Sequence, residues 1–237
     1  MTQAKSLHFF ASPPESCSYL PQRDSISVFA DPVAKMNART YSQLVNHGFR
    51  RSGRYVYRPH CPSCSACVPA RVPVRRFKPN RSQRRNLKAN RDLSIRVLPC
   101  DFREEHFDLY RRYLSARHAG GQMDNPTPDT YRNFLQCDWL DTMFVEFRLA
   151  GELLSVAVAD QLAGGLSAVY TFFDPDHSAR GLGTYAVLWQ IARARRRGLD
   201  YVYLGYWIAE NAKMSYKIQF KPVEGLVDGK WRLLATP

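Results

Sequence analysis

The chain has 237 residues, of which 45% are hydrophobic and 13% aromatic, and its formal net charge is +13. This composition is that of a packed globular protein and excludes a disordered chain, and no run of about 18 apolar residues predicts a membrane span. The N-terminal stretch lacks the basic start and long apolar centre of a secretory signal, so we expect a cytoplasmic protein whose six cysteines are thiols or metal ligands and not disulfides.

Positive charge is concentrated between Arg50 and Arg96. This segment holds fourteen Lys and Arg residues and a single acid, Asp92. Most of the fourteen are arginines, which pair with phosphates through two parallel hydrogen bonds and stack on nucleic-acid bases. The segment therefore favours a nucleic-acid partner over an ordinary solvated surface.

Residues 1–98 are rich in Cys, Pro and Arg, and we expect them to form a smaller N-terminal lobe that contacts the nucleic acid. An apolar stripe at helical spacing predicts a helix from Thr40 to Gly53. A second, basic helix is predicted after Asn80 or Ser82, because either side chain can cap its first turn.

Residues 99–237 have a more regular pattern and predict a mixed α/β domain. Helices are expected after Asp101 and Thr127, which are suitable caps. Strands separated by glycine turns are predicted over Met143–Leu149, Leu153–Gln161 and Leu166–Phe173. A further glycine turn opens a helix that ends at Gly198, and a strand over Tyr201–Trp207 follows. Strand, helix and strand in this order predict a parallel crossover in a mixed sheet.

The turn Arg180–Gly183 stands at the start of the crossover helix, where free backbone amides suit a phosphate or a developing negative charge. Its spacing matches neither GxxxxGK[ST] nor GxGxxG, which excludes those two nucleotide-binding motifs. The turn is similar to the pyrophosphate loop of GCN5-related acyltransferases, whose motif is Gln/Arg-x-x-Gly-x-Gly/Ala. Gly181 and Gly183 match the two later positions of this motif, but Ser178 stands where the motif has Gln or Arg. This departure disfavours acetyl-CoA while leaving an acyltransferase-like fold.

The stretch "YVYLGYWIAENAKMSYKIQFKP", residues 201–222, resembles the C-terminal signature of the arginyl-tRNA–protein transferases. In the first half, Cys17-x-Tyr19-Leu20-Pro21, "GFRRSG", "YRPHCPSCSACVPARV" and "FKPNRSQRR" are similar to the short bacterial branch of that family, the aspartate/glutamate leucyltransferases. The resemblance spans nearly the whole chain. It implies a GCN5-related acyltransferase-like fold with a mixed sheet. It also implies a leucyl-tRNA donor and protein acceptors that begin with Asp or Glu and are marked for degradation.

Three alternatives to this function stay open from the sequence. Within the family, the donor can be arginyl-tRNA instead of leucyl-tRNA. Outside it, an acetyl-CoA-dependent N-acetyltransferase has a similar fold, and a non-catalytic RNA-binding protein accounts for the charge but leaves the C-terminal signature unused.

The resemblance, together with the alternation of side chains along a strand, assigns catalytic roles around Gly205. Alternation places Tyr203 and Gly205 on one face and Tyr206 on the other. We expect Gly205 to permit close approach to the sheet and Tyr206 to orient the ester or the leaving 3′-oxygen. Lys217 is expected to stabilise the oxyanion or to contact the terminal phosphates.

Further substrate contacts are expected from two groups of residues. Those in the C-terminal signature are Tyr203, Trp207, Lys213 and Tyr216. The acceptor's carboxylate needs a cation, for which the candidates are Arg76, Lys78, Arg81 and Arg84. Arg84 and Arg85 are expected to bind the tRNA.

Cys61, Cys64 and Cys67 follow one another at three-residue spacing. With Cys17 or His60 as a fourth ligand they can hold zinc or an iron–sulfur cluster, whereas the alternative is that the thiols pack a loop without metal. The single CxxCxxC run has no second ligand pair at finger spacing, so a zinc-finger module is not expected. The chemistry itself requires no cofactor, because the ester of a charged tRNA is already activated.

Overall fold

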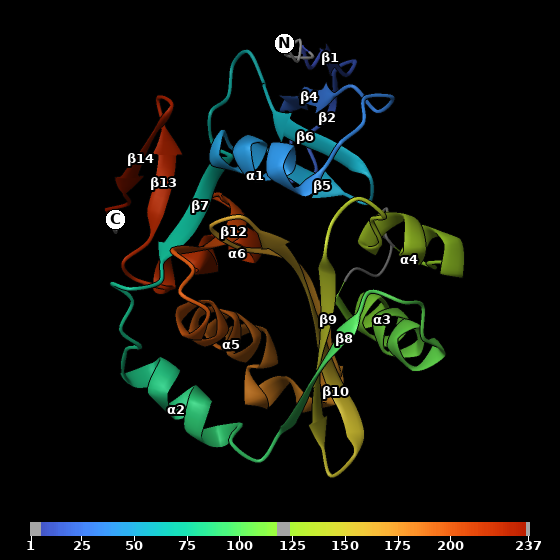
Figure 1. Ribbon diagram of the computed structural model, residues 1–237, viewed down its shortest axis with the longest axis vertical. Helices are drawn as coiled ribbons and strands as arrows, with labels where there is room; N and C mark the ends of the chain where they lie inside the picture. Colours follow the sequence, from blue (N-terminus) through green and yellow to red (C-terminus); the bar gives the residue numbers. More distant parts are fainter. Residues whose placement is uncertain (1–5, 118–123, 236–237) are drawn as a thin grey trace, which may run out of the picture.

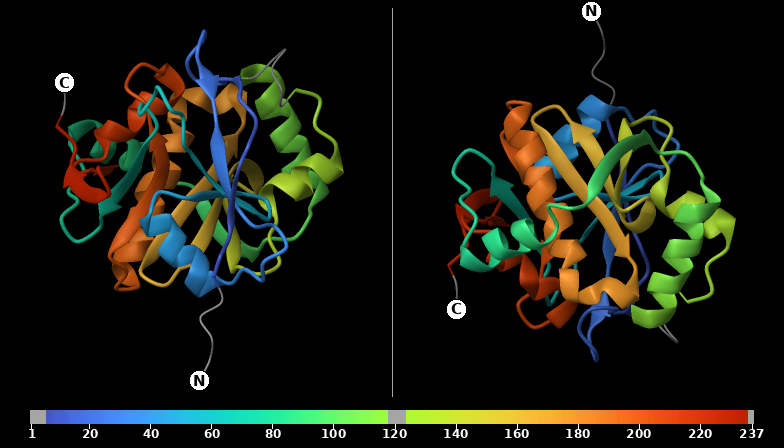
Figure 2. Two further views of the ribbon diagram at one scale, coloured as in Figure 1. Left: turned by 90° about the horizontal axis from the view of Figure 1, so that it is seen from above. Right: turned by 90° about the horizontal axis from the view of Figure 1, so that it is seen from below.

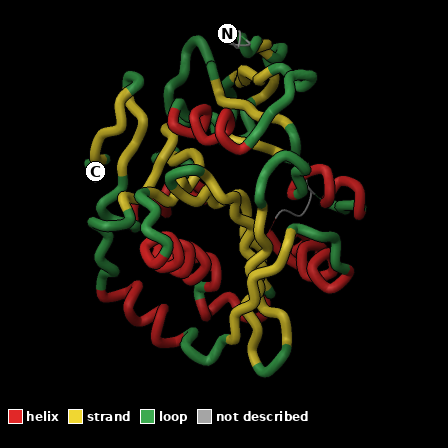
Figure 3. Tube along the Cα trace, in the orientation of Figure 1, coloured by secondary structure: helices red, strands yellow, loops and turns green. Residues whose placement is uncertain are grey.

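The computed structural model describes residues 6–117 and 124–235 (Figures 1 and 3). Its largest element is an eight-stranded sheet. The strand order is β14 (Lys230–Leu233), β13 (Glu224–Val227), β7 (Val68–Pro73), β12 (Tyr201–Trp207), β11 (Gly165–Phe173), β10 (Glu152–Leu162), β9 (Thr142–Leu149) and β8 (Ser94–Pro99). β11 and β12 are parallel and the other neighbouring strands are antiparallel, so the predicted mixed α/β fold is confirmed.

A smaller four-stranded sheet lies above the larger one in Figure 1. Its order is β1 (Phe9–Ala11), β4 (Ser27–Ala30), β6 (Tyr55–Pro59) and β5 (Arg50–Ser52), and a two-stranded ribbon pairs β2 (Glu15–Ser16) with β3 (Asp24–Ser25). The two halves of the sequence share the larger sheet, because β7 lies between β13 and β12. The predicted boundary between residues 98 and 99 falls inside β8.

Helices cover both faces of the larger sheet. They are α1 (Ala38–Asn46), α2 (Arg81–Ala89), α3 (Glu104–Arg117), α4 (Pro128–Leu135), α5 (Leu182–Arg196) and α6 (Ala212–Ser215), with 3-10 turns η1 (Pro175–Arg180) and η2 (Tyr216–Gln219). One apolar core joins α5 to the sheet, and a second joins α3 and α4 to it. α2 packs on α5 (Figure 2). None of the helices in the described ranges is long and apolar enough to cross a bilayer.

Capping residues account for two of the predicted helix starts. Asn80 Oδ1 accepts a hydrogen bond from the backbone N–H of Gln83, and Gln83 Oε1 accepts one from the backbone N–H of Asn80. Thr127 caps α4 in the same reciprocal way, with Pro128 at the first helical position. Both predictions are confirmed, since each cap satisfies backbone amides that have no partner inside the helix.

Two predicted helix boundaries are wrong. The helix expected from Thr40 to Gly53 ends at Asn46, because Gly48 adopts a φ of +86° and the chain then enters β5. The helix expected directly after Asp101 begins at Glu104. After the early end of α1, Phe49 is buried and Arg50 begins strand β5.

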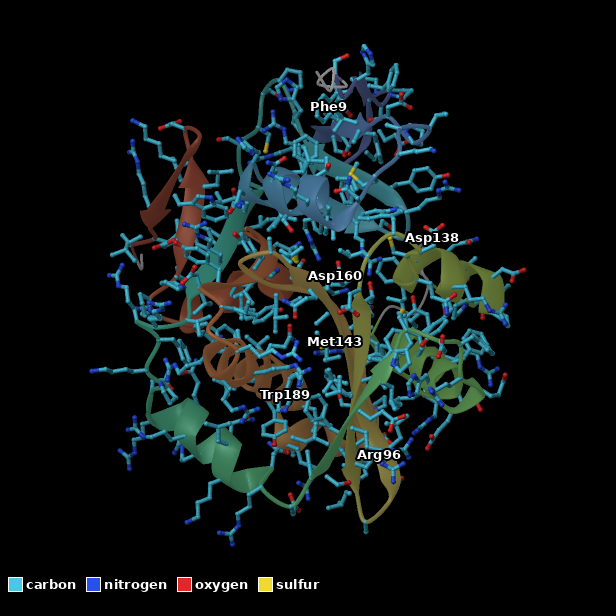
Figure 4. The ribbon with its side chains drawn as sticks, viewed as in Figure 1. Phe9, Arg96, Asp138, Met143, Asp160 and Trp189 are labelled. Atoms are coloured by element: carbon cyan, nitrogen blue, oxygen red, sulfur yellow. The ribbon has the colours of Figure 1, made fainter. Side chains whose placement is uncertain are left out.

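A buried ion pair joins the two sheets. The Arg51 guanidinium of β5 donates to both carboxylate oxygens of Asp160 in β10, at 2.7 and 2.8 Å, and both side chains are fully buried. Arg51 also donates to Thr142 Oγ1 and to the carbonyl of Leu135. Figure 4 labels Asp160 at the level where the smaller sheet meets the larger one. This network fixes β5, and with it the neighbouring Arg50, against the larger sheet.

We expect Arg51→Met to lower the free energy of unfolding by about 3–5 kcal/mol, because it leaves the Asp160 carboxylate buried without a partner. Urea unfolding followed by circular dichroism measures the loss. Arg54→Met is the matched control, because Arg54 is exposed and a surface substitution changes stability by about 0.5 kcal/mol or less. Equal stability of the two variants would contradict the assigned role of the pair.

Candidate active site

The parallel strands β11 and β12 separate part of the way along their length. They pair only where Gly165–Ser167 meets Tyr201–Tyr203, although both strands continue further. The side chain of Arg50 lies at this divergence. Its Nη2 donates to the carbonyl of Val169 at 3.1 Å and lies 3.5 Å from that of Ala168. The Arg50 guanidinium thus provides the hydrogen bonds to carbonyls of β11 that have no partner in β12.

Gly205 allows the guanidinium to come this close to the sheet. A Cβ at position 205 would lie 2.5 Å from Arg50 Cζ. The backbone φ of Gly205 is +76°, a value that residues other than glycine rarely adopt. The expected close approach to the sheet at Gly205 therefore occurs, and the approaching group is the protein's own Arg50.

The pairing of β12 with β7 is irregular at the same point. The register shifts between Tyr203 and Gly205, as it does at a β-bulge. Tyr203 Oη donates to Asn46 Oδ1 and Tyr206 Oη donates to the carbonyl of Gly48, so both rings point toward the end of α1. The predicted placement of Tyr206 on the opposite face from Tyr203 is wrong, because the bulge inserts one residue into the alternation.

Tyr206 is buried and its polar atoms are occupied. Its hydroxyl donates to Gly48 at 3.0 Å, and the Arg50 guanidinium lies 5.7 Å from the centre of its ring, within the range of a cation–π contact. Burial raises the pKa of the Tyr206 hydroxyl well above its usual value, so it stays protonated. The ring and backbone of Tyr206 are thus placed to position its neighbours.

Lys217 lies directly behind Tyr206. Its Nζ donates to the carbonyl of Tyr206 at 2.7 Å and lies 3.2 Å from Met214 Sδ, and the residue is 4% exposed. Burial, and then the charge of Arg50, lower the pKa of Lys217 to about 7. A neutral amine has two N–H groups, and these two acceptors match them.

Arg50 and Lys217 form a pair of basic groups without an acid partner. Within the described residues, their contacts are to carbonyls, a sulfur atom and aromatic rings, and no carboxylate pairs with either. Unpaired positive charge in a poorly solvated site destabilises the fold and attracts anions. This arrangement suits a developing oxyanion or a phosphate of a bound substrate.

A cavity of about 570 Å³ opens beside Tyr206 and is called the Cys-lined pocket here. Tyr57, His60 and Arg23 are among its lining residues. Its thiols are those of Cys17, Cys61, Cys64 and Cys67. The four predicted ligands are therefore brought together around one cavity, next to the divergence of β11 and β12.

The sulfur atoms in this pocket are engaged with the protein. Cys17 Sγ accepts from the backbone amide of Leu20, and Cys64 Sγ accepts from Arg23 Nη1, both at 3.4 Å. Burial, and then the neighbouring thiols, raise the pKa of Cys67 to about 12, which opposes the thiolate form that binds metals. Within residues 6–117 and 124–235, no three His, Cys, Asp or Glu side chains are grouped to hold a metal ion. The geometry thus supports packed thiols, and the predicted zinc or cluster site is not confirmed in the described residues.

Three other predicted residues surround the same site. Trp207 ends β12, and the ring of Tyr216, which is 40% exposed, lies 5.1 Å from Lys217 Nζ. Lys213 is exposed on α6. The signature residues of β12, α6 and η2 are therefore close in space.

The predicted acceptor-binding cations are not part of this group. Arg76 and Lys78 line a separate cavity of about 380 Å³ beyond the Pro73 end of β7, whereas the Val68 end adjoins the Cys-lined pocket. A strand of six residues spans roughly 17 Å. The remaining predicted cations, which lie exposed on α2, are Arg81, Arg84 and Arg85.

The glycine turn before α5 has a packing role. Asn86 Nδ2 of α2 donates to the carbonyls of Arg180 and Gly181, at 2.9 and 3.1 Å, and Arg180 pairs with Asp92 at 2.9 Å. A Cβ at Gly181 would lie 2.8 Å from Asn86 Nδ2. The glycine therefore permits α2 to pack on the turn. This packing explains why a glycine stands at position 181 without requiring a bound cofactor.

Sequence reasoning missed Arg50 and Arg23 as site residues. Arg50 belongs to the "GFRRSG" run, but its charge does not separate it from the other thirteen cations of its segment. Its neighbour Arg51 is buried in an ion pair, as is Arg71 with Glu224 at 2.8 Å, so neither of these faces a nucleic acid. Arg23 precedes the basic segment, and only the folded chain brings it to Tyr206.

Similar proteins agree with this architecture. The family parts described as "Arginine-tRNA-protein transferase, N terminus" and "Arginine-tRNA-protein transferase, C terminus" match residues 15–85 and 105–227. An aspartate/glutamate leucyltransferase of Nitrosococcus oceani is 55% identical over 99% of both chains. One of Pseudomonas fluorescens is 52% identical over 99% of this chain and 100% of its own.

Solved structures with similar folds are more distant. L-PGS from Bacillus licheniformis aligns with a TM-score of 0.48 at 13% identity, over 64% of this chain and 48% of that one. FemX aligns with a TM-score of 0.45 at 10% identity, over 70% and 59%. The sequence relatives, at 52% to 55% identity over 99% of the chain, together with the two matched family parts, establish that this protein belongs to the arginine-tRNA-protein transferase family and is a transferase.

Proposed function

We propose that the enzyme moves leucine from leucyl-tRNA to the α-amine of proteins that begin with Asp or Glu, and so marks them for degradation. The observation that carries this proposal is the identity above 50% to aspartate/glutamate leucyltransferases along essentially the whole chain. A reaction that uses charged tRNA takes place where translation does, which supports a cytoplasmic location.

The transfer is an aminolysis of an activated ester. The acceptor's nitrogen attacks the leucyl carbonyl carbon, the bond to the 3′-oxygen of the tRNA breaks, and the proton lost by the nitrogen ends on that oxygen. The products are an amide and free tRNA, so no ATP and no metal ion is needed for the energy balance. The protein has to deprotonate the ammonium group, hold the oxyanion and align two large substrates.

The two basic side chains at the divergence of β11 and β12 suit these tasks. Arg50 offers a fixed positive charge to the carbonyl oxygen as it becomes negative. Lys217, with a pKa of about 7, is suited to take the proton from the acceptor's ammonium group. Tyr206 acts as a positioning residue, because its ring faces Arg50 and its carbonyl holds Lys217.

The exposed cations on and near α2 suit the body of the tRNA. Arg81, Arg84 and Arg85 project from α2, which packs on α5 next to the exposed Arg195 and Arg196. Neutralising phosphates in this way releases counterions, so the affinity for tRNA falls as salt rises. In this assignment Arg76 and Lys78 also serve the nucleic acid and not the acceptor's side chain.

Labelled leucyl-tRNA and arginyl-tRNA, offered with peptides that begin with Asp, Glu, Lys or Ala, test the function. We expect label to reach only the Asp and Glu peptides, and only from leucyl-tRNA. Transfer from arginyl-tRNA would assign the enzyme to the arginyl branch. Acetylation of the peptides from acetyl-CoA, with no aminoacyl transfer, would overturn the proposal.

The pH dependence of transfer tests the role of Lys217. Since only the neutral amine can accept a proton, we expect kcat to fall as the pH drops below about 7. Lys217→Met should lose about 10²- to 10⁴-fold in kcat and retain only the inflection of the acceptor's own amine, near 7.7–8.0. Lys230→Met, at an exposed lysine of β14, is the control and should keep the wild-type profile. An unchanged profile in the Lys217 variant would rule out the proton-transfer role.

A further inference from the structure

We propose that Arg23 binds the side-chain carboxylate of the acceptor's first residue in the Cys-lined pocket. The inference rests on the proposed acceptors, proteins that begin with Asp or Glu, and names the residue that selects them. Arg23 lies between the short strands β2 and β3, outside the segment where most cations are found.

Arg23 lies in the same cavity as Tyr206 of the proposed reaction centre. Within the described residues, it is the only Arg or Lys that lines the Cys-lined pocket, and Tyr206 lines the same cavity. The carbonyl of Tyr206 holds Lys217. An acceptor whose carboxylate is held by Arg23 therefore places its α-amine in the cavity that Tyr206 lines, next to the residue whose carbonyl contacts Lys217.

The charges in the pocket match both ends of such an acceptor residue. Asp24 and Asp228 also line the cavity and suit the positively charged α-amine. Arg23 provides a planar guanidinium, which can bind a carboxylate through two parallel hydrogen bonds. An N-terminal Asp or Glu carries both charges, whereas a neutral first residue lacks the one that Arg23 recognises.

The present partners of Arg23 leave it available to a substrate. It contacts Cys64 Sγ at 3.4 Å and Glu210 Oε2 at 3.3 Å, and the contact with Glu210 is long for a charge-assisted hydrogen bond. The side chains of Arg23 and Glu210 are 45% and 59% exposed, and ion pairs this exposed stabilise a fold very little. Glu210 thus competes with a substrate carboxylate and is readily displaced by it.

Peptide binding tests the assignment without the donor. Peptides that begin with Asp or with Asn, labelled at the C-terminus, are titrated with protein and followed by fluorescence anisotropy. We expect Arg23→Gln to weaken binding of the Asp peptide roughly 10- to 100-fold and to change binding of the Asn peptide less than about twofold. Arg111→Gln is the matched control, because Arg111 is also an exposed arginine paired with an exposed acid, Asp108, and it should bind as wild type does.

A second variant separates recognition from a structural role of the ion pair. Glu210→Gln removes the competing acid, so it should bind the Asp peptide more tightly, by a few-fold. If the pair only supported the fold, both variants would weaken binding and lower the melting temperature together. Opposite effects on affinity at an unchanged melting temperature are expected.

Transfer of leucine, measured with the same proteins and peptides, distinguishes the two proposals. Arg23→Gln should raise the KM for the Asp peptide and leave the KM for leucyl-tRNA unchanged. Wild-type affinity of Arg23→Gln for the Asp peptide would overturn the inference. Absence of leucine transfer by the wild type, with Asp-peptide binding that still depends on Arg23, would refute the proposed function and leave this assignment standing.

Discussion

The contact of Arg50 with Gly205 is the constraint on which the rest of the site depends. The guanidinium occupies the space where β11 and β12 separate, and the absence of a side chain at Gly205 lets it lie against the sheet. The bulge at Gly205 also turns Tyr206 toward Arg50, and the Tyr206 carbonyl in turn holds Lys217. One backbone irregularity thus sets the place of both cations.

Two arginines at adjacent positions of β5 have opposite roles. Arg51 is neutralised by Asp160 and joins the sheets, whereas Arg50 next to it has carbonyl and aromatic neighbours but no acid among the described residues. Alternation along β5 explains the difference, because successive side chains of a strand point to opposite faces. The paired arginine stabilises the fold, and the unpaired one leaves a positive potential where the ester carbonyl is proposed to react.

Local signals in the sequence predicted the elements better than the site. The caps at Asn80 and Thr127 and the crossover through α5 depend on neighbouring residues, and those predictions are confirmed. The predicted orientation of Tyr206 is wrong because a bulge at Gly205 interrupts the strand periodicity, and the glycine, which often marks a bulge, was assigned only to close approach. Arg23 was missed because a pocket assembled from segments distant in the sequence has no local pattern.

The central claim is that the leucyl end of the tRNA binds where β11 and β12 part, beside the Cys-lined pocket. Photocrosslinking from tRNA charged with a diazirine analogue of leucine, followed by mass spectrometry of the attached peptides, tests it most directly. The account predicts crosslinks to β12 near Tyr206 and to the pocket residues between Tyr57 and Cys67. Crosslinks confined to the start of α5 around Gly181, or to α3 and α4, would contradict it.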